Sequence, residues 1–417
     1  MTDKKYDFRL LIGYKQKVVF IVENIEIRVK MNLNGINQIQ PKVLQKAKET
    51  TKPVETQIAQ TAGETKKTAD SGCLKNYFLG SVSFGGHPCK TSNFQVKKLK
   101  DVPCCCCGKP MLREQDLAVC KKAVAKTSGE HLAETLKEYS RYMRSDEKCV
   151  GTILANEAKA TGCDVAGGMK QTAPNVRKLT GEYCKSILKE LDAMATKAFK
   201  SEDNPMAGII ENAKEGIDAG RGLDRSTFVE KLDRASGRLG EEDQALIQDM
   251  AMELPQTFNH VQRIYDKYTN RKPDDIARRL FSTALTTAEH IHPHSLGGPD
   301  NTANYIAECA GCNNPRGNMS YAEWLKVHPE YPRKAQEHVE HVQARLINGE
   351  LGTDYNDWPV DVRASLSKES GGRMTLKVLN PSTIAEMRKA RGMEGNVTVQ
   401  DVRAAYEEQE AEKAEKA

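Results

Sequence analysis

Two pairs of cysteines have a spacing that is typical of metal sites. Two residues separate Cys104 from Cys107, and two residues separate Cys309 from Cys312. Zinc prefers four soft ligands in a tetrahedron, and two turns that each offer two thiolates supply them. Free cysteines in loops are the alternative, but free thiols seldom repeat this spacing twice. The sequence therefore predicts one structural Zn²⁺ held by these four cysteines.

The register of the first pair is ambiguous, because Cys104 to Cys107 are consecutive cysteines. Cys105 or Cys106 could replace one of the outer two as a ligand. Gly108 favours the outer two, since glycine relieves the tight turn after the second thiolate. A chain of 417 residues with twelve cysteines fits reduced thiols and metal ligands better than the disulfide framework of small secreted proteins.

The segment before the second cysteine pair carries the other reactive groups. It reads E-H-I-x-P-x-S-x-G-G from Glu289, then Asn304, then C-x-x-C-N-x-x-R-G from Cys309. Together with the first cysteine pair, this pattern closely resembles the HNH endonuclease family. The resemblance is to the members whose ββα-metal fold is braced by a four-cysteine zinc site. It covers only residues 104–108 and 288–325.

The resemblance implies an endonuclease that hydrolyses phosphodiester bonds with one divalent cation. Glu289 and Asn313 stand where the family holds Mg²⁺ or Mn²⁺, although Asp is commoner at the first position. Such a sparse oxygen site leaves most positions of the cation for water and phosphate. His290 stands where the family has its general base, and an imidazole can accept a proton from water near neutral pH.

Three further residues receive roles from the same resemblance. Asn304 would pin the loop and help orient the histidine, Arg316 would contact phosphate, and His292 would line the phosphate site. Adjacent residues on a regular strand point to opposite faces. Glu289 and His290 can therefore aim at one point only if a twist or bulge re-aims one of them.

A three-histidine metal site is a rival interpretation, because His290, His292 and His294 share one face of a strand. Pro293 and the following Gly-Gly turn argue against it, since they end the strand early. A third interpretation treats the histidines as polar loop residues. It leaves the spacing to Asn304 and to the second cysteine pair unexplained.

Hydrophobic periodicity predicts the elements that position these residues. Between residues 114 and 285, apolar residues recur at intervals of three and four, which is typical of helices. The predicted fold class is mostly α with a small α+β part, in which a ββα-metal HNH module is interrupted by, or joined to, a large all-helical block. The predicted parts are a short N-terminal β-like segment (1–39), a disordered linker (40–72), an irregular segment with the first zinc turn (73–113), an inserted helical domain (114–285), the HNH core (286–346) and a mixed C-terminal region with a charged helical tail (347–417).

The helical block separates the two cysteine pairs. If both pairs bind one zinc ion, the block is an insertion whose two ends must lie close together. Otherwise the first pair serves elsewhere, with Cys73, Cys89 or Cys120 as its partner. We favour the insertion, because a half-site would leave two thiolates unexplained.

The helix after the motif has recognisable features of its own. Ser320 and Glu323 are spaced as a capping box at its start. Trp324 is expected to pack this helix on the strands. His328 and His338 lie among charged residues, so we expect them on solvated helix faces.

Composition limits the partners. The net charge of +5 is small for this length, so any face that binds nucleic acid must be local. We expect nucleic acid as substrate, with double-stranded DNA favoured over RNA, and an immunity or regulatory protein on the helical block. No segment has the apolar length of a membrane span or of a cleaved secretory signal, which favours a cytoplasmic protein and leaves signal-free export open. A nuclease toxin, or an inactive zinc-stabilised module that binds nucleic acid or protein, is the alternative.

Overall fold

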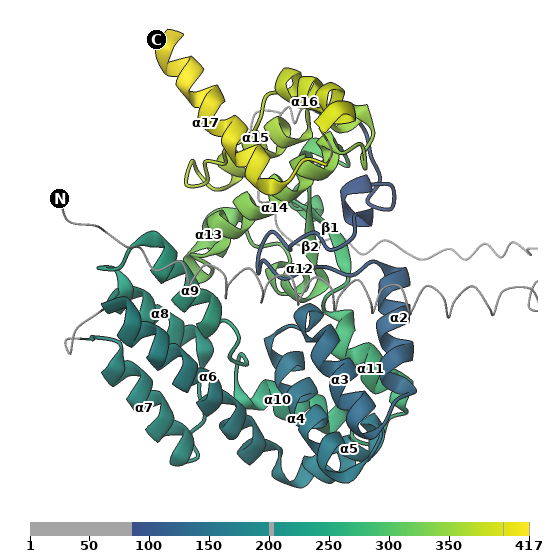
Figure 1. The fold of residues 1–417 in the computed structure, drawn as a ribbon, viewed down its shortest axis with the longest axis vertical. Helices are drawn as coiled ribbons and strands as arrows, with labels where there is room; N and C mark the ends of the chain where they lie inside the picture. Colours follow the sequence, from purple (N-terminus) through teal and green to yellow (C-terminus); the bar gives the residue numbers. More distant parts are fainter. Residues whose placement is uncertain (1–85, 200–203, 395, 417) are drawn as a thin grey trace, which may run out of the picture. The chain divides into compact units, whose positions relative to one another are not determined.

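Helices make up most of the chain that the structure describes, and a two-stranded antiparallel sheet accompanies them (Figure 1). The computed structural model describes residues 86–199, 204–394 and 396–416. The predicted β-like segment (1–39) and linker (40–72) lie outside the described residues. A mostly helical fold with a small α+β part is confirmed. Within the described ranges, none of the helices combines the length and apolar character that crossing a bilayer requires.

A β-hairpin and a short helix follow one another in the order strand, strand, helix. They are β1 (Thr286–His290), β2 (Tyr305–Cys309) and α12 (Ala310–Arg316). In the register of the hairpin, Glu289 faces Ile306 and His290 faces Tyr305. One residue faces one residue along the whole pairing, so of the twist or bulge expected at Glu289 and His290, the structure shows no bulge. The two side chains therefore point to opposite faces of the hairpin.

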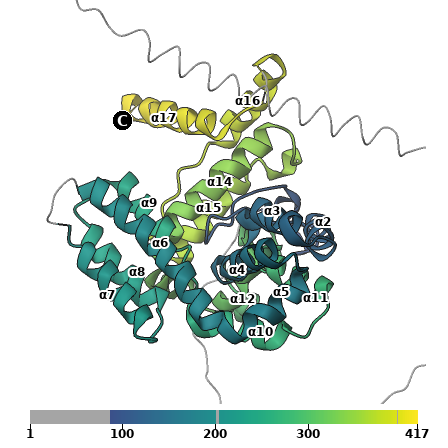
Figure 2. The ribbon, with the colours of Figure 1, turned by 60° about the horizontal axis from the view of Figure 1, so that its bottom comes forward.

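The helical block contains two separate hydrophobic cores, and Figures 1 and 2 show the corresponding two groups of helices. The first group is α2 (Glu114–Ala125), α3 (Gly129–Tyr139), α4 (Ser145–Thr161), α5 (Val165–Thr172), α10 (Phe258–Tyr268) and α11 (Pro273–Ser282), with 3-10 turns at Ser140–Tyr142 and Ala173–Asn175. The second group is α6 (Val176–Phe199), α7 (Ala207–Asp218), α8 (Arg225–Ser236) and α9 (Glu241–Ala251). Polar caps start several of these helices. Asp164, Asp224 and Thr257 each accept a hydrogen bond from the third backbone N–H that follows.

The two ends of the block lie side by side. Leu112, just before α2, forms a parallel bridge with Leu285, just before β1. The backbone N–H of Leu112 donates to Ala284 at 2.9 Å, and the N–H of Thr286 donates to Leu112 at 2.9 Å. An insertion into a small module requires this closeness of entry and exit.

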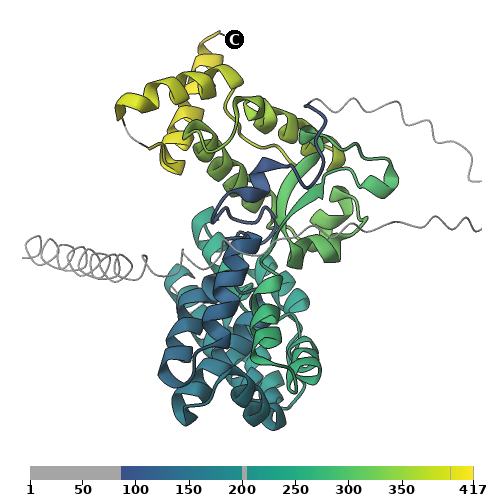
Figure 3. The same cartoon turned by 90° about the vertical axis from the view of Figure 1, so that its right-hand side faces the viewer.

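The chain on both sides of the block shares one core with the hairpin. The later helices are α13 (Tyr321–Val327), α14 (Tyr331–Ile347), α15 (Trp358–Glu369), α16 (Pro381–Glu394) and α17 (Val399–Lys416), with 3-10 turns at Gln95–Lys98, His294–Leu296, Thr302–Asn304 and Thr353–Tyr355. Phe94, Tyr305 and Trp358 are buried together in this core. The indole N–H of Trp358 donates to the backbone oxygen of Tyr305 at 3.1 Å. Figure 3 shows the hairpin between the helical block and the C-terminal helices.

Predictions for α13 and α14 had mixed outcomes. The capping box is confirmed, since Ser320 and Glu323 exchange hydrogen bonds of 3.2 Å. Trp324 is buried in the core as expected. The prediction for His338 is wrong, because its imidazole is fully buried and Nδ1 bonds to the Pro103 carbonyl at 2.7 Å. His328 pairs with Glu330 at 2.9 Å.

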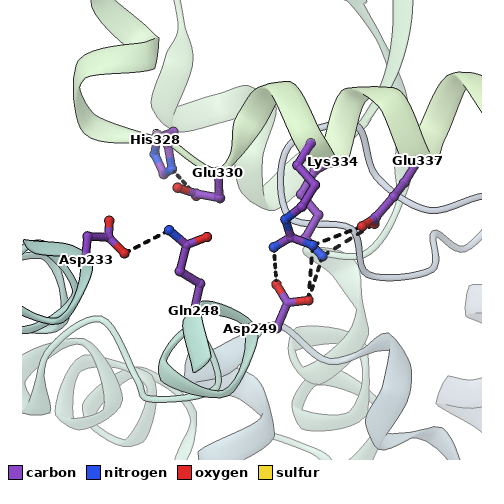
Figure 4. A network of polar contacts seen from close by, with 8 residues as sticks. Asp233, Gln248, Asp249, His328, Glu330, Lys334 and Glu337 are labelled. Atoms are coloured by element: carbon purple, nitrogen blue, oxygen red, sulfur yellow. Dashed lines mark hydrogen bonds and ion pairs between the residues drawn. The ribbon is translucent and has the colours of Figure 1, made fainter. Parts of the chain in front are cut away.

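Ion pairs join the block to α14 (Figure 4). Asp249 of α9 accepts from Arg333 at 2.7 Å and from Lys334 at 2.9 Å. Lys334 also lies against the turn of the first cysteine pair, where a Cβ added at Gly108 would meet its side chain at 2.6 Å. The second group of helices therefore contacts the same part of the fold as the first cysteine turn.

Candidate functional site

The first cysteine pair lies in a tight turn. Pro103 and Pro110 form an antiparallel bridge at its base. Inside the turn, the N–H of Gly108 donates to the Cys104 carbonyl at 2.9 Å. Gly108 has a φ of 68°, a left-handed conformation that favours glycine. This conformation agrees with the tight turn that was predicted at Gly108.

The four predicted zinc ligands come together. Each of Cys104, Cys107, Cys309 and Cys312 offers a sulfur, and these atoms all lie within 4.8 Å of one another. Cys107 Sγ and Cys309 Sγ are 4.0 Å apart, although 202 positions separate them in the sequence. Zinc–sulfur bonds of about 2.3 Å place the sulfurs of a tetrahedron about 3.8 Å apart. The cluster therefore fits a metal ion such as zinc. Cys89 and Cys120 are not members of it, and Cys73 lies outside the described residues.

The remaining two cysteines of the run have other surroundings. Cys105 Sγ lies 3.2 Å from the hydroxyl of Tyr331, and burial raises the pKa of Cys105 to about 11. Cys106 belongs to a second group with Glu308 and Cys312. The outer pair thus enters the four-cysteine cluster, while Cys106 remains a neighbour that shares Cys312.

Arg144, which belongs to the helical block, places a positive charge beside the four-cysteine cluster. Hydrogen bonds from neighbouring thiols, first Cys104, hold the pKa of Cys107 well below its usual value. The Nε of Arg144, just before α4, donates to Cys309 Sγ at 3.1 Å. Arg144 is buried, and its Nη1 and Nη2 have no hydrogen-bond partner among the described residues. A buried cation beside several thiols favours their ionised form, which is the form that binds metal.

His290, at the opposite end of the hairpin, has an acidic partner. Its Nε2 lies 2.9 Å from Asp300 Oδ1, and its ring meets the Tyr305 ring edge-on at 4.7 Å. The Tyr305 hydroxyl donates to the same oxygen of Asp300 at 2.7 Å. Hydrogen bonds from His290 and then Tyr305 lower the pKa of Asp300. Asp300 was not among the residues predicted from the sequence, although an acid three residues after Gly297 was a usable signal.

The three histidines do not share one site. His294 lies near His290 and Asp300, with Nδ1 3.7 Å from Asp300 Oδ1. His292 instead lies 3.1 Å from Glu369 of α15. The three-histidine interpretation is therefore wrong. His292 is thus paired with a carboxylate, and its expected phosphate role stays a prediction.

Asn304 is fully buried and fixes the loop between the strands. Its Oδ1 accepts from the N–H of His292 at 2.8 Å. Its Nδ2 donates to the carbonyls of His292 at 3.1 Å and Pro299 at 3.0 Å. The loop thereby holds a set position next to His290, as the resemblance implied.

The other face of the hairpin holds Glu289 and Asn313. Glu289 is 5% exposed and forms an ion pair with Arg316. Arg316 also donates to the carbonyl of Met319 at 2.7 Å, and its guanidinium lies 4.6 Å from the centre of the Tyr321 ring. Arg316 is thus buried and paired, which contradicts its predicted contact with phosphate. Asn313 donates from Nδ2 to Thr287 Oγ1 at 2.9 Å, on the same face as Glu289.

No protein-family model matches this chain, and no curated protein or solved structure is significantly similar to it. Its function is therefore inferred from the hairpin, the helix and the cysteine cluster.

Proposed function

We propose that this chain is a metal-dependent endonuclease of the HNH kind. The observation that carries the proposal is the pairing of His290 with Asp300 on a hairpin whose other end joins a four-cysteine cluster. The order strand, strand, helix and the position of Cys309 and Cys312 on β2 and α12 agree with the motif that the sequence resembles. Zinc in the cluster would be structural and would fix the helix to the hairpin.

His290 is the proposed general base. When its Nε2–H is donated to Asp300, Nδ1 is the basic nitrogen. Asp300 then stabilises the imidazolium that forms once a water molecule has lost its proton to the ring. His290 remains partly open to solvent, with 18% of its side chain exposed, so a water molecule and a phosphate can reach it. The proposal assigns Asp300 the role of orienting His290.

A cation such as Mg²⁺ or Mn²⁺ is proposed to bind Glu289 and Asn313, which lie on one face of the hairpin. A carboxylate and an amide oxygen are ligands that these cations accept, and the cation would polarise the phosphate. Because Glu289 points away from His290, it can serve only after its carboxylate releases Arg316 and turns toward the face of His290. Cation binding and a movement of Arg316 are therefore linked in this proposal.

A basic surface supports nucleic acid as the substrate. Lys267, Arg271 and Arg278 are exposed around a hollow beside α10 and α11, which the half-buried Tyr268 and the exposed Asp275 also line. Arg278 lies on α11, which ends shortly before β1 in the chain. Lysine and arginine bind the phosphate backbone without regard to sequence. Double-stranded DNA remains the favoured partner, on the resemblance.

The ion pair between Glu289 and Arg316 favours a second candidate function. A carboxylate that is neutralised by a buried arginine has no charge to spare for a cation. On this view the chain is a zinc-braced module that binds nucleic acid without cutting it.

Cleavage of supercoiled plasmid separates the two candidates. The full chain is incubated with Mg²⁺ or Mn²⁺, zinc is counted in the same samples, and His290→Ala is compared with His131→Ala, a substitution at an exposed histidine on α3. The nuclease proposal expects cation-dependent cutting that His290→Ala abolishes and His131→Ala retains, with equal DNA binding by both. Binding without cutting by the zinc-loaded wild type would refute the nuclease and support the second candidate.

A further inference from the structure

Three potential metal ligands meet at the exposed end of the hairpin. His290 ends β1, His294 begins the 3-10 turn that follows, and Asp300 lies beyond the Gly-Gly turn. One ligand atom from each lies within 4.8 Å of the other two. The rings of His290 and His294 have centres 5.3 Å apart. His294 is 69% exposed and Asp300 is 50% exposed, so an ion can reach the group from solvent.

The distances suit a transition metal. Bonds of about 2.0–2.1 Å from zinc to nitrogen or oxygen place the ligands of a tetrahedron about 3.3 Å apart. His290 Nε2 is 2.9 Å and His294 Nδ1 is 3.7 Å from Asp300 Oδ1, on either side of that value. Two imidazoles with one carboxylate select Zn²⁺, Ni²⁺, Co²⁺ or Cu²⁺, whereas Mg²⁺ prefers oxygen ligands.

The surroundings hold the ligands in place. The buried Tyr305 donates its hydroxyl proton to Asp300 at 2.7 Å, as outer partners of metal ligands commonly do. Asn304 ties the loop at His292 and Pro299, on both sides of the Gly-Gly turn. A Cβ at Gly298 would collide with the carbonyl of His292, so the loop packs as closely as glycine allows.

We propose that His290, His294 and Asp300 form an inhibitory site for a divalent transition metal. This site is separate from the four-cysteine cluster and from the face that carries Glu289 and Asn313. Its effect on cutting rests on the proposed nuclease function. A metal ion bound to His290 Nε2 takes the place of the proton that was donated to Asp300. The neutral imidazole then carries its proton on Nδ1, so no basic nitrogen remains to accept a proton from water.

Direct binding tests the site without relying on activity. Full-length protein already loaded with zinc is titrated calorimetrically with Ni²⁺, and bound nickel and zinc are counted after gel filtration. The wild type should retain one zinc and bind one nickel. His294→Ala and Asp300→Asn should bind nickel at least about tenfold more weakly, since even the loss of an outer partner costs that much. His131→Ala should bind like the wild type, because its histidine lies on another surface.

Equal nickel affinity in the wild type and His294→Ala would overturn the site, and so would failure of the wild type to bind nickel. Tyr305→Phe gives a milder check, because it removes only the hydroxyl that holds Asp300. It should weaken nickel binding while the hairpin stays folded. An unchanged affinity in this variant would contradict the preformed geometry.

A cleavage arm tests inhibition separately. At fixed Mg²⁺, nickel should slow cutting by the wild type, and each variant is compared with its own rate in Mg²⁺ alone. His294→Ala should require at least about tenfold more nickel for the same slowing. Equal sensitivity would refute the inhibitory role. If no form of the protein cuts DNA, the proposed nuclease function fails, while the nickel titration still decides the metal site.

Discussion

Arg144 links the helical block to the cysteine cluster, and replacing it gives a quantitative test of that link. The residue lies next to α4, but its guanidinium contacts Cys309 at 3.1 Å. It lines a cavity of about 280 Å³ with Cys107 and Cys312 on one side and Arg225 on another. Arg144→Met keeps most of the length of the side chain and removes its charge. We expect this variant to fold and to bind zinc more weakly.

The size of the effect follows from the contact. Four thiolates around Zn²⁺ carry a net charge of about −2, which a buried arginine partly neutralises. A hydrogen bond to a charged group contributes about 1.5–3 kcal/mol. Since about 1.4 kcal/mol is a tenfold change, zinc affinity should fall about 10- to 100-fold.

Competition against a chromophoric zinc chelator measures this affinity on the full chain. Arg225→Met is the matched control, because Arg225 lines the same cavity but bonds to Ser145 and to the Leu254 carbonyl instead of a thiol. It should cost stability in the block and leave zinc affinity unchanged. If the zinc affinity of Arg144→Met lies within about threefold of the wild-type value, the change in binding free energy is less than about 0.7 kcal/mol. Arg144 would then not stabilise the charge of the zinc-bound thiolates.

Three further substitutions test other parts of the fold by chemical denaturation. Glu289→Gln leaves the buried Arg316 without a charged partner and should lower the free energy of unfolding by about 3–5 kcal/mol. A decrease of less than about 1 kcal/mol would mean that the ion pair does not form. Burial lowers the pKa of His338 to about 4, so the unfolded chain, with a pKa near about 6.5, takes up the proton first as the pH falls. The stability that neutral His338 contributes is complete above pH ~6.5 and is lost as the pH falls toward ~4. The free energy of unfolding of His338→Asn should therefore fall by about 1–3 kcal/mol less than that of the wild type over this range. Equal dependence of the two unfolding free energies on pH would refute this expectation. Asp249→Asn removes the carboxylate that pairs with Lys334 and should lower the free energy of unfolding by about 1–3 kcal/mol. Asp243→Asn replaces an exposed acid on the same helix and should leave the free energy of unfolding unchanged. Equal effects of the two substitutions would contradict the ion pair between Asp249 and Lys334 that Figure 4 shows.

The sequence predicted those features that depend on spacing within a short segment. The four cysteines were identified from two repeats of one spacing, and the structure brings their sulfurs together. The capping box at Ser320 also depends on nearby residues. Such local geometry varies little with the rest of the fold, so residue types at fixed intervals are enough to predict it.

Apart from the shared cysteine cluster, contacts between side chains that are distant in the sequence were not predicted. No pattern near Arg144 indicates a contact with Cys309, which is 165 positions away. Arg316 was assigned to phosphate because its position matches a motif, but the structure buries it against Glu289. Asp300 was overlooked because His290 was considered with Glu289, Asn304 and the neighbouring histidines. Each error concerns where a side chain points, which strand pairing and packing decide.

The attachments of the helical block explain how a partner on that block could control the hairpin. The block enters and leaves at Leu112 and Leu285, touches Cys309 through Arg144, and holds Lys334 through Asp249. Lys334 packs against the turn of the first cysteine pair, so two of these contacts end at the cluster itself. A protein that shifted α4 or α9 would have to break the contact of Arg144 with Cys309 or of Asp249 with Lys334, or else move the turn of the first cysteine pair. An immunity or regulatory protein on the block, which remains a prediction, would therefore act first on metal retention and only then on His290. Zinc release in the presence of such a partner is accordingly a more direct readout than cutting.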